Sequence, residues 1–138
     1  MIKTPFRRSS GGMIDRRKHI EFEFNGKTYF GHEGDTLASA LLANGVFLTA
    51  RSFKYHRPRG IMGAGVEEPS CLVELLGENA AGNHPATTVR LRPGLAAKSV
   101  NCWPSPNFDL LSINQLFSRF LPAGFYYKTF MWPNWHLF

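Results

Sequence analysis

Apolar and polar positions alternate through residues 19–24, where Ile20, Phe22 and Phe24 are separated by polar side chains. A period of two is typical of a half-buried strand. Asn25 and Gly26 follow, and both tolerate the positive φ angles of a type I′ turn. The pattern therefore predicts a hairpin whose second strand covers residues 27–31.

The next apolar pattern has helical spacing. Residues 36–43 place Leu37 and Leu41 on one face, which predicts a short amphipathic helix that can lie across a sheet. We expect Asp35 to be its N-cap, because an Asp carboxylate accepts hydrogen bonds from the first-turn amides. Gly45 is suited to the C′ position that ends the helix.

Further extended segments are predicted at residues 46–48, 71–76 and 87–91, the last ended by a turn at Pro93 and Gly94. A hairpin, one helix, a long loop and more strands indicate an α+β fold, most simply a β-grasp in which a sheet curls over one helix. Beyond residue 95 we expect a helix at 107–121 and an aromatic tail at 125–135 that packs on another domain or subunit. The predicted division is an extended basic arm (1–16), a β-grasp domain (17–95) and a helical, aromatic extension (96–138).

Composition adds limits to this interpretation. The chain has 138 residues, of which 43% are hydrophobic and 19% charged, which favours one folded domain with an extension over two domains or disorder. No apolar run reaches membrane-spanning length and the first residues lack a signal-peptide core, so we expect a cytoplasmic chain. Its two cysteines, Cys71 and Cys102, are expected to be free thiols.

The net charge of +6 is concentrated partly in a loop at residues 51–60, where cations alternate with aromatic rings. Such a loop can bind phosphates or single-stranded nucleic acid. A solvated loop, or one that pairs with acidic residues of a partner, is favoured here because no recognised nucleic-acid-binding motif accompanies it.

No catalytic residue is predicted from the sequence. The glycine-rich segment 60–65 lacks dinucleotide-binding spacing, and the five histidines show no metal-binding spacing. Glu67 and Glu68 are adjacent on an extended chain and point apart, which argues against a paired-carboxylate site. The segment 60–65 is expected to serve as a tight turn.

Three long segments, at residues 34–46, 51–61 and 122–133, resemble the N-terminal region of the alpha subunit of heterotetrameric sarcosine oxidases. The resemblance implies a [2Fe-2S] ferredoxin-type β-grasp fold. Related cluster-binding modules carry a Cys-x4-Cys-x2-Cys run and a fourth, later cysteine, because four thiolates converge on two irons.

Aligned with that run, the cluster positions in this chain are Gly63, Glu68, Cys71 and Thr87. Only Cys71 carries a thiol, so the resemblance implies a fold that kept the sheet and lost the metal. We therefore expect no metal and no cofactor bound by this chain alone.

The resemblance also implies a role in a complex that oxidatively demethylates sarcosine to glycine, with hydrogen peroxide and formaldehyde or methylenetetrahydrofolate as further products. FAD, FMN and NAD are expected in that complex, outside this chain. The expected partners are the remainder of the alpha subunit and the beta, gamma and delta subunits. Arg57 and Arg59 are candidates for contact with a cofactor phosphate, although structural ion pairs are the favoured interpretation.

Two alternatives remain at this stage. One is an electron-transfer module of an amine or amino-acid dehydrogenase that still binds a [2Fe-2S] cluster, with Cys102 or a partner residue completing the ligand set. The other is a basic β-grasp protein that binds nucleic acid through residues 51–60.

Overall fold

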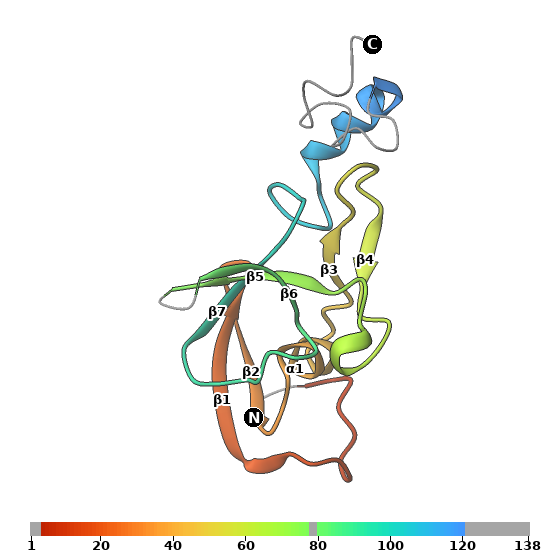
Figure 1. The fold of residues 1–138 in the computed structure, drawn as a ribbon. Coiled ribbons are helices and arrows are strands. Elements are labelled where there is room, and N and C mark those ends of the chain that lie inside the picture. Colours follow the sequence, from red (N-terminus) through yellow and green to blue (C-terminus); the bar gives the residue numbers. More distant parts are fainter. Residues whose placement is uncertain (1–3, 78–79, 121–138) are drawn as a thin grey trace.

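A computed structural model describes residues 4–77 and 80–120 of the chain. Within these residues, five strands form one mixed sheet in the order β2-β1-β7-β5-β6 (Figure 1). The central strand β7 is parallel to β1 and antiparallel to β5. The strands are β1 (Asp15–Phe24), β2 (Lys27–Glu33), β5 (Leu72–Leu76), β6 (Ala81–Pro85) and β7 (Leu95–Ser99).

The predicted hairpin is confirmed and is longer than its sequence pattern indicated. Strands β1 and β2 pair antiparallel up to Phe24 opposite Lys27. Asn25 and Gly26 have φ angles of 52° and 73°, which are the positive values that a tight I′ turn requires.

The predicted helix is also confirmed, as α1 (Leu37–Ala43), but its predicted N-cap was wrong. Thr36 is the N-cap: its hydroxyl accepts from the Ser39 amide, and the Ser39 hydroxyl accepts from the Thr36 amide in return. The Asp35 carboxylate instead forms an ion pair with Arg7 of the N-terminal arm. Gly45 has a φ of 81° directly after the helix, as a C′ residue should.

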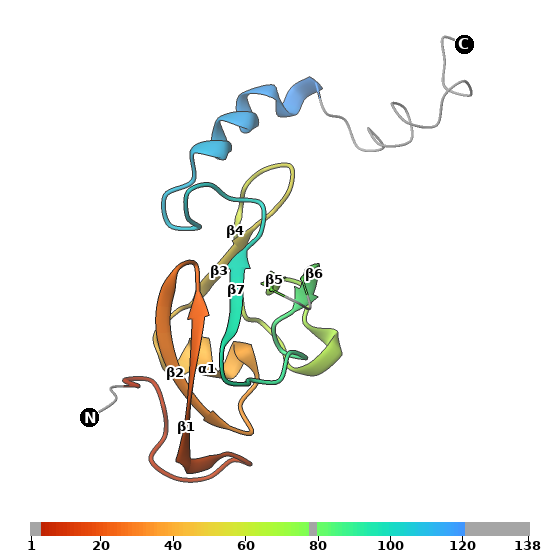
Figure 2. The same cartoon turned by 90° about the vertical axis from the view of Figure 1, so that its left-hand side faces the viewer.

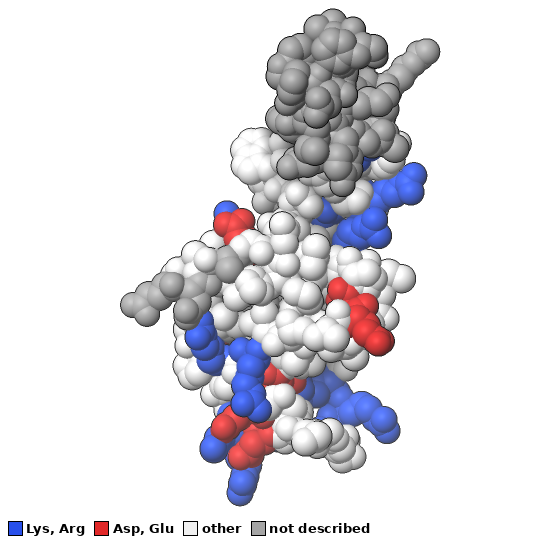
Figure 3. All heavy atoms as spheres, viewed as in Figure 1, with Lys and Arg blue, Asp and Glu red and all other residues white. Residues whose placement is uncertain are grey.

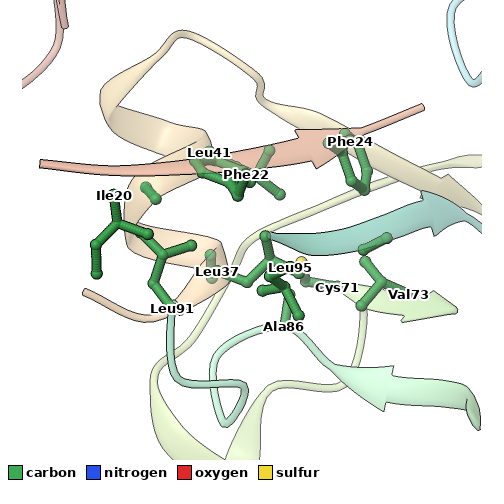
Figure 4. Packing of buried hydrophobic residues seen from close by; sticks show 13 residues of the cluster. Ile20, Phe22, Phe24, Leu37, Leu41, Cys71, Val73, Ala86, Leu91 and Leu95 are labelled. Atoms are coloured by element: carbon green, nitrogen blue, oxygen red, sulfur yellow. The ribbon is translucent and has the colours of Figure 1, made fainter. Parts of the chain in front are cut away.

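The core lies between α1 and the inner face of the sheet (Figure 4). Phe22 and Phe24 from β1 and Leu37 and Leu41 from α1 are at most 2% exposed. Each such side chain contributes roughly 1.5–3 kcal/mol by leaving water. Strands β5 and β7 supply Val73 and Leu95 to the same cluster. The α+β, β-grasp prediction is therefore confirmed.

The strand predicted at residues 87–91 was wrong. This segment crosses the start of α1 and bonds to it: the Leu37 amide donates to the Val89 carbonyl and the Leu91 amide to the Asp35 carbonyl. The segment forms one isolated bridge, between Thr36 and Arg90. The strands that follow β5 along the chain are β6 and β7, which lie on either side of it in the sheet and which the sequence pattern did not predict.

A second, two-stranded sheet pairs β3 (Leu48–Arg51) with β4 (Pro58–Gly60), and a short 3-10 helix, η1 (Gly65–Glu67), follows.

The helix predicted from residue 107 begins at Leu110 and is the 3-10 helix η2 (Leu110–Phe120). Figures 1 and 2 show η2 beyond the tip of the β3–β4 hairpin. The aromatic tail at 125–135 lies outside the described residues. The sheet continues to Ser99, past the boundary expected at residue 95, and the three-part division of the chain stays a prediction.

Candidate functional site

The loop between β4 and β5 surrounds the carboxylate of Glu68, which is 3% exposed. The Met62 amide donates to Oε2 at 2.7 Å, and the Gly63 amide donates to the same oxygen. The amides of Ser70 and Cys71 donate to Oε1 at 2.7 and 3.0 Å. Backbone donors from both ends of the loop therefore converge on one buried anion.

This environment keeps Glu68 ionised and Cys71 neutral. Burial alone raises the pKa of Glu68, but the four backbone hydrogen bonds outweigh burial and hold the pKa below its ordinary value. Burial raises the pKa of the Cys71 thiol, which is 0% exposed. A neutral, enclosed thiol is a poor metal ligand and a poor nucleophile.

The four sequence-predicted cluster positions are brought into this one loop region. Gly63 and Cys71 both donate to the Glu68 carboxylate. The Thr87 hydroxyl donates to the Gly65 carbonyl at 2.6 Å. These contacts bring the four positions close together in the fold.

The residues present do not fit a [2Fe-2S] cluster. Four thiolates are the usual ligands of such a cluster, and Cys71 is the one thiol among these four positions. Cys102 lines a different cavity, with Asn25 and Lys98. In the described part of the chain, no group of three or more His, Cys, Asp or Glu side chains is placed to hold a metal ion.

The basic loop lies at the tip of the β3–β4 hairpin, and Lys and Arg gather over this region in Figure 3. The ring of Tyr55 has the Lys54 ammonium 4.9 Å and the Arg57 guanidinium 5.0 Å from its centre. Arg57 and Arg59 are exposed. Neither makes an ion pair with a carboxylate of the described residues, so their pairing with a partner stays a prediction.

A buried polar network that sequence reasoning missed joins this hairpin to the extension. His56 Nδ1 lies 2.7 Å from Asp109 Oδ2, and the two side chains are 4% and 1% exposed. Arg51 donates from Nε to the Pro106 carbonyl and from Nη1 to the His56 carbonyl, both at 2.8 Å. Since the paired groups are 53 and 55 residues apart in the chain, no local motif marks them.

The N-terminal arm is fixed by a second buried carboxylate. Arg7 donates from Nη1 and Nη2 to the two oxygens of Asp35, at 3.1 and 2.7 Å. Asp35 also accepts from the His32 amide and the Ser39 hydroxyl. Each of its two carboxylate oxygens therefore accepts two hydrogen bonds. The arm therefore lies against α1 rather than in open solvent.

Large apolar side chains on the extension are exposed, including Trp103 (59%), Phe108 (63%), Ile113 (60%) and Leu116 (74%). Phe53, in the loop of the adjacent β3–β4 hairpin, is 75% exposed. Several exposed apolar side chains on one part of a protein mark an interaction surface. Among the described helices, none is long and apolar enough to cross a membrane.

A mixed sheet that curls over one helix is typical of the ferredoxin-like β-grasp class. In the loop after β4, Gly63, Glu68 and Cys71 have the spacing of the Cys-x4-Cys-x2-Cys run of that class. Residues 17–102 match the 2Fe-2S iron-sulfur cluster binding domain family. Since this match covers more than half of the chain, the chain belongs to that family. Membership concerns the fold, while the assignment of the four cluster positions stays a prediction; three of those four positions carry no thiol.

Curated relatives extend the similarity beyond this domain. The chain is 55% identical over 131 residues to a sarcosine oxidase subunit alpha of Rhizobium meliloti (strain 1021), covering 94% of this chain and 13% of that protein. It is 39% identical over 93 residues to the same-named subunit of Corynebacterium sp. (strain U-96), covering 64% of this chain and 10% of the relative. The chain thus spans only about an eighth or less of these relatives.

Among solved structures, the L-proline dehydrogenase of P. horikoshii has a similar fold. The TM-score is 0.51 at 23% sequence identity, over 66% of this chain and 17% of the dehydrogenase chain. This likeness shows the fold alone.

Proposed function

We propose that this chain forms the N-terminal structural and interface part of a sarcosine oxidase alpha subunit. The observation that carries the proposal is the 55% identity over 131 residues, which extends through the arm, the β-grasp domain and the extension. The proposed complex oxidatively demethylates sarcosine to glycine, yielding hydrogen peroxide with formaldehyde or methylenetetrahydrofolate. In this proposal the chain supplies a scaffold, and the chemistry occurs elsewhere in the complex.

The proposed partners are the remainder of the alpha subunit and the beta, gamma and delta subunits. The exposed apolar side chains of the extension support this part of the proposal, because such a surface is costly to leave in water. Arg57 and Arg59 lie on the neighbouring hairpin. We propose that they pair with carboxylates of the partner, in preference to a cofactor phosphate.

FAD, FMN and NAD are proposed to bind outside this chain, and the complex is proposed to be cytoplasmic. The donor set of the β4–β5 loop supports a chain that binds no cofactor by itself, because Glu68 and Thr87 stand where thiolates are required. An electron-transfer role through this domain has no support in that donor set.

The proposal is tested by capturing the native protein from its source cells. Mass spectrometry then identifies the intact polypeptide, its partners and any released flavin, and a peroxide assay measures oxidation of sarcosine. We expect flavin-bearing partners and peroxide formation that depends on sarcosine. A preparation with no flavoprotein partner and no such peroxide would exclude the proposed function and leave only the fold assignment.

A further inference from the structure

We propose that the carboxylate of Glu68 is the structural substitute for the iron-sulfur cluster in this chain. In this view the β4–β5 loop is held by an anion that belongs to the protein itself, so the loop needs no metal to fold. The inference concerns the loop alone and does not depend on the sarcosine oxidase assignment.

The hydrogen-bond pattern is the first argument. Sulfur atoms of a bound cluster accept hydrogen bonds from the protein around them. Here the donors are the Met62 and Gly63 amides before Glu68 and the Ser70 and Cys71 amides after it. All four donate to one carboxylate. The hydrogen bonds from Ser70 and Cys71 are buried, and without this acceptor their amides would lose their partner, which is costly for a buried donor.

The position of the anion is the second argument. Gly63, Glu68 and Cys71 have the spacing of the Cys-x4-Cys-x2-Cys run. Glu68 therefore occupies a ligand position, and its side chain turns inward to the donors on either side. The neighbouring Glu67 is exposed, and the four described amides donate to Glu68 rather than to it, so an acidic residue in this loop is not by itself enough.

The space around Gly63 is the third argument. A Cβ atom at Gly63 would lie 3.6 Å from Glu68 Oε2 and 3.7 Å from Glu68 Cα, which is ordinary contact. The backbone of Gly63 is not in the left-handed region either. The backbone thus accepts a side chain at this cluster position, and a cysteine can be introduced there.

The first test compares Glu68→Gln with Glu67→Gln in the full-length protein. Hydrogen exchange is followed by mass spectrometry on peptides that cover residues 60–72. We expect exchange in Glu68→Gln to be at least about tenfold faster than in the wild type, because the charged acceptor of four backbone amides is lost. Glu67→Gln should match the wild type. Equal protection in the two variants would overturn the proposal.

The second test introduces cysteines at the cluster positions, and it tests the proposal even if Glu68→Gln does not fold. The variant Gly63→Cys/Glu68→Cys/Thr87→Cys has, with Cys71, thiols at all four cluster positions, and the control Gly63→Cys/Thr87→Cys keeps the Glu68 carboxylate and has thiols at three. Both are incubated anaerobically with iron and sulfide. Bound metal is measured by elemental analysis and visible absorption.

We expect about two irons per chain in the variant with four thiols, together with wild-type protection of residues 60–72. The control and the wild type should bind no stoichiometric iron. The proposal is overturned if the four-thiol variant stays without metal, folded or not. It is equally overturned if the control or the wild type takes up the same amount of iron.

Discussion

Buried carboxylates hold three separate segments of this molecule in place. Asp35 fixes the N-terminal arm through Arg7, Glu68 fixes the β4–β5 loop through backbone amides, and Asp109 fixes the extension through His56. Each is almost fully enclosed and accepts several hydrogen bonds. Buried charges are stabilising only when they are paired and hydrogen-bonded, so the loss of one partner is expected to be costly at each site.

Replacing Asp35 with Asn should destabilise the fold by about 2–3 kcal/mol, because the Arg7 guanidinium, which is 12% exposed, loses its ionised partner. Asp15→Asn is the matched control: its ion pair with Arg17 is exposed and should matter little. Urea denaturation measures the free energy of unfolding of both variants. Equal stability of the two variants would contradict the role given to Asp35.

Acid should weaken the fold through Glu68 and Asp109, whose pKa values both lie below their ordinary values of 4.5 and 3.8. Burial opposes ionisation at both sites, but hydrogen bonds outweigh it: backbone amides at Glu68, and backbone amides with His56 at Asp109. A lowered folded-state pKa means that the unfolded chain takes up protons first. The stabilisation is therefore complete above about pH 5 and is lost as the pH falls through the folded-state pKa values.

Urea denaturation at intervals from pH 6 to pH 3 measures this loss. The Glu68→Gln variant should show a smaller fall in unfolding free energy over this range than the wild type, since one of the two titrating groups is gone. A fall of the same size in both proteins would show that Glu68 does not titrate as described.

At the scale of elements, the sequence predicted correctly the helix and the turn whose formation depends on residues close together in the chain. The hairpin at Asn25 and Gly26 and the helix that stops before Gly45 follow from turn and capping preferences of a few residues. β7 has no such signal, because its residues, Leu95–Ser99, include no β-branched or aromatic side chain. It is a strand because it lies between β1 and β5, which are distant in sequence.

The candidate site shows the same division. Its positions, Gly63, Glu68, Cys71 and Thr87, could be found from their spacing and the family resemblance, and the loop does bring them together. The inward carboxylate of Glu68 could not be predicted, since an acidic pair in a loop is usually solvated. The link between His56 and Asp109 was equally hidden, because it depends on where the extension folds back.

Two glycines, one at the end of β4 and one early in the β4–β5 loop, should respond differently to alanine. A Cβ atom at Gly60 would meet the carbonyl oxygen of Phe47, which is backbone and cannot move aside easily. Gly60→Ala should therefore cost about 1–3 kcal/mol. Gly63→Ala meets only ordinary contacts and should be neutral or stabilising by about 0.5 kcal/mol. Urea denaturation of both variants measures the difference, and a Gly60→Ala protein as stable as Gly63→Ala would contradict the described packing.

At the scale of the whole molecule, the described residues form a closed core with two different ends. The arm and the open end of the β1–β2 hairpin lie at one end, and the extension lies at the other, beyond the β3–β4 hairpin (Figures 1 and 2). The core side chains are enclosed within the chain itself. The apolar side chains of the extension are exposed, and the extension that carries them is bonded to the β3–β4 hairpin through Arg51, His56 and Asp109.

This arrangement predicts that the extension is the part of the chain that a partner covers. The double substitution Ile113→Glu/Leu116→Glu places two charges on side chains that are 60% and 74% exposed, so the fold of the β-grasp domain should be unaffected. In a buried interface the same charges would be desolvated without partners, and the affinity for the partner should fall at least about a hundredfold. Co-purification and analytical ultracentrifugation of the native assembly measure the loss.

The matched control for this substitution is Met13→Glu, at a side chain that is 98% exposed on the N-terminal arm. Its assembly should equal that of the wild type, because the proposed interface does not include the arm. Dissociation in the control but not in the double variant would move the interface to the arm. Intact assembly in both would contradict the proposed interface, because the apolar side chains of η2 would then stay exposed to water in the complex. The burial of the β-grasp core alone would have to offset the free-energy cost of that exposure.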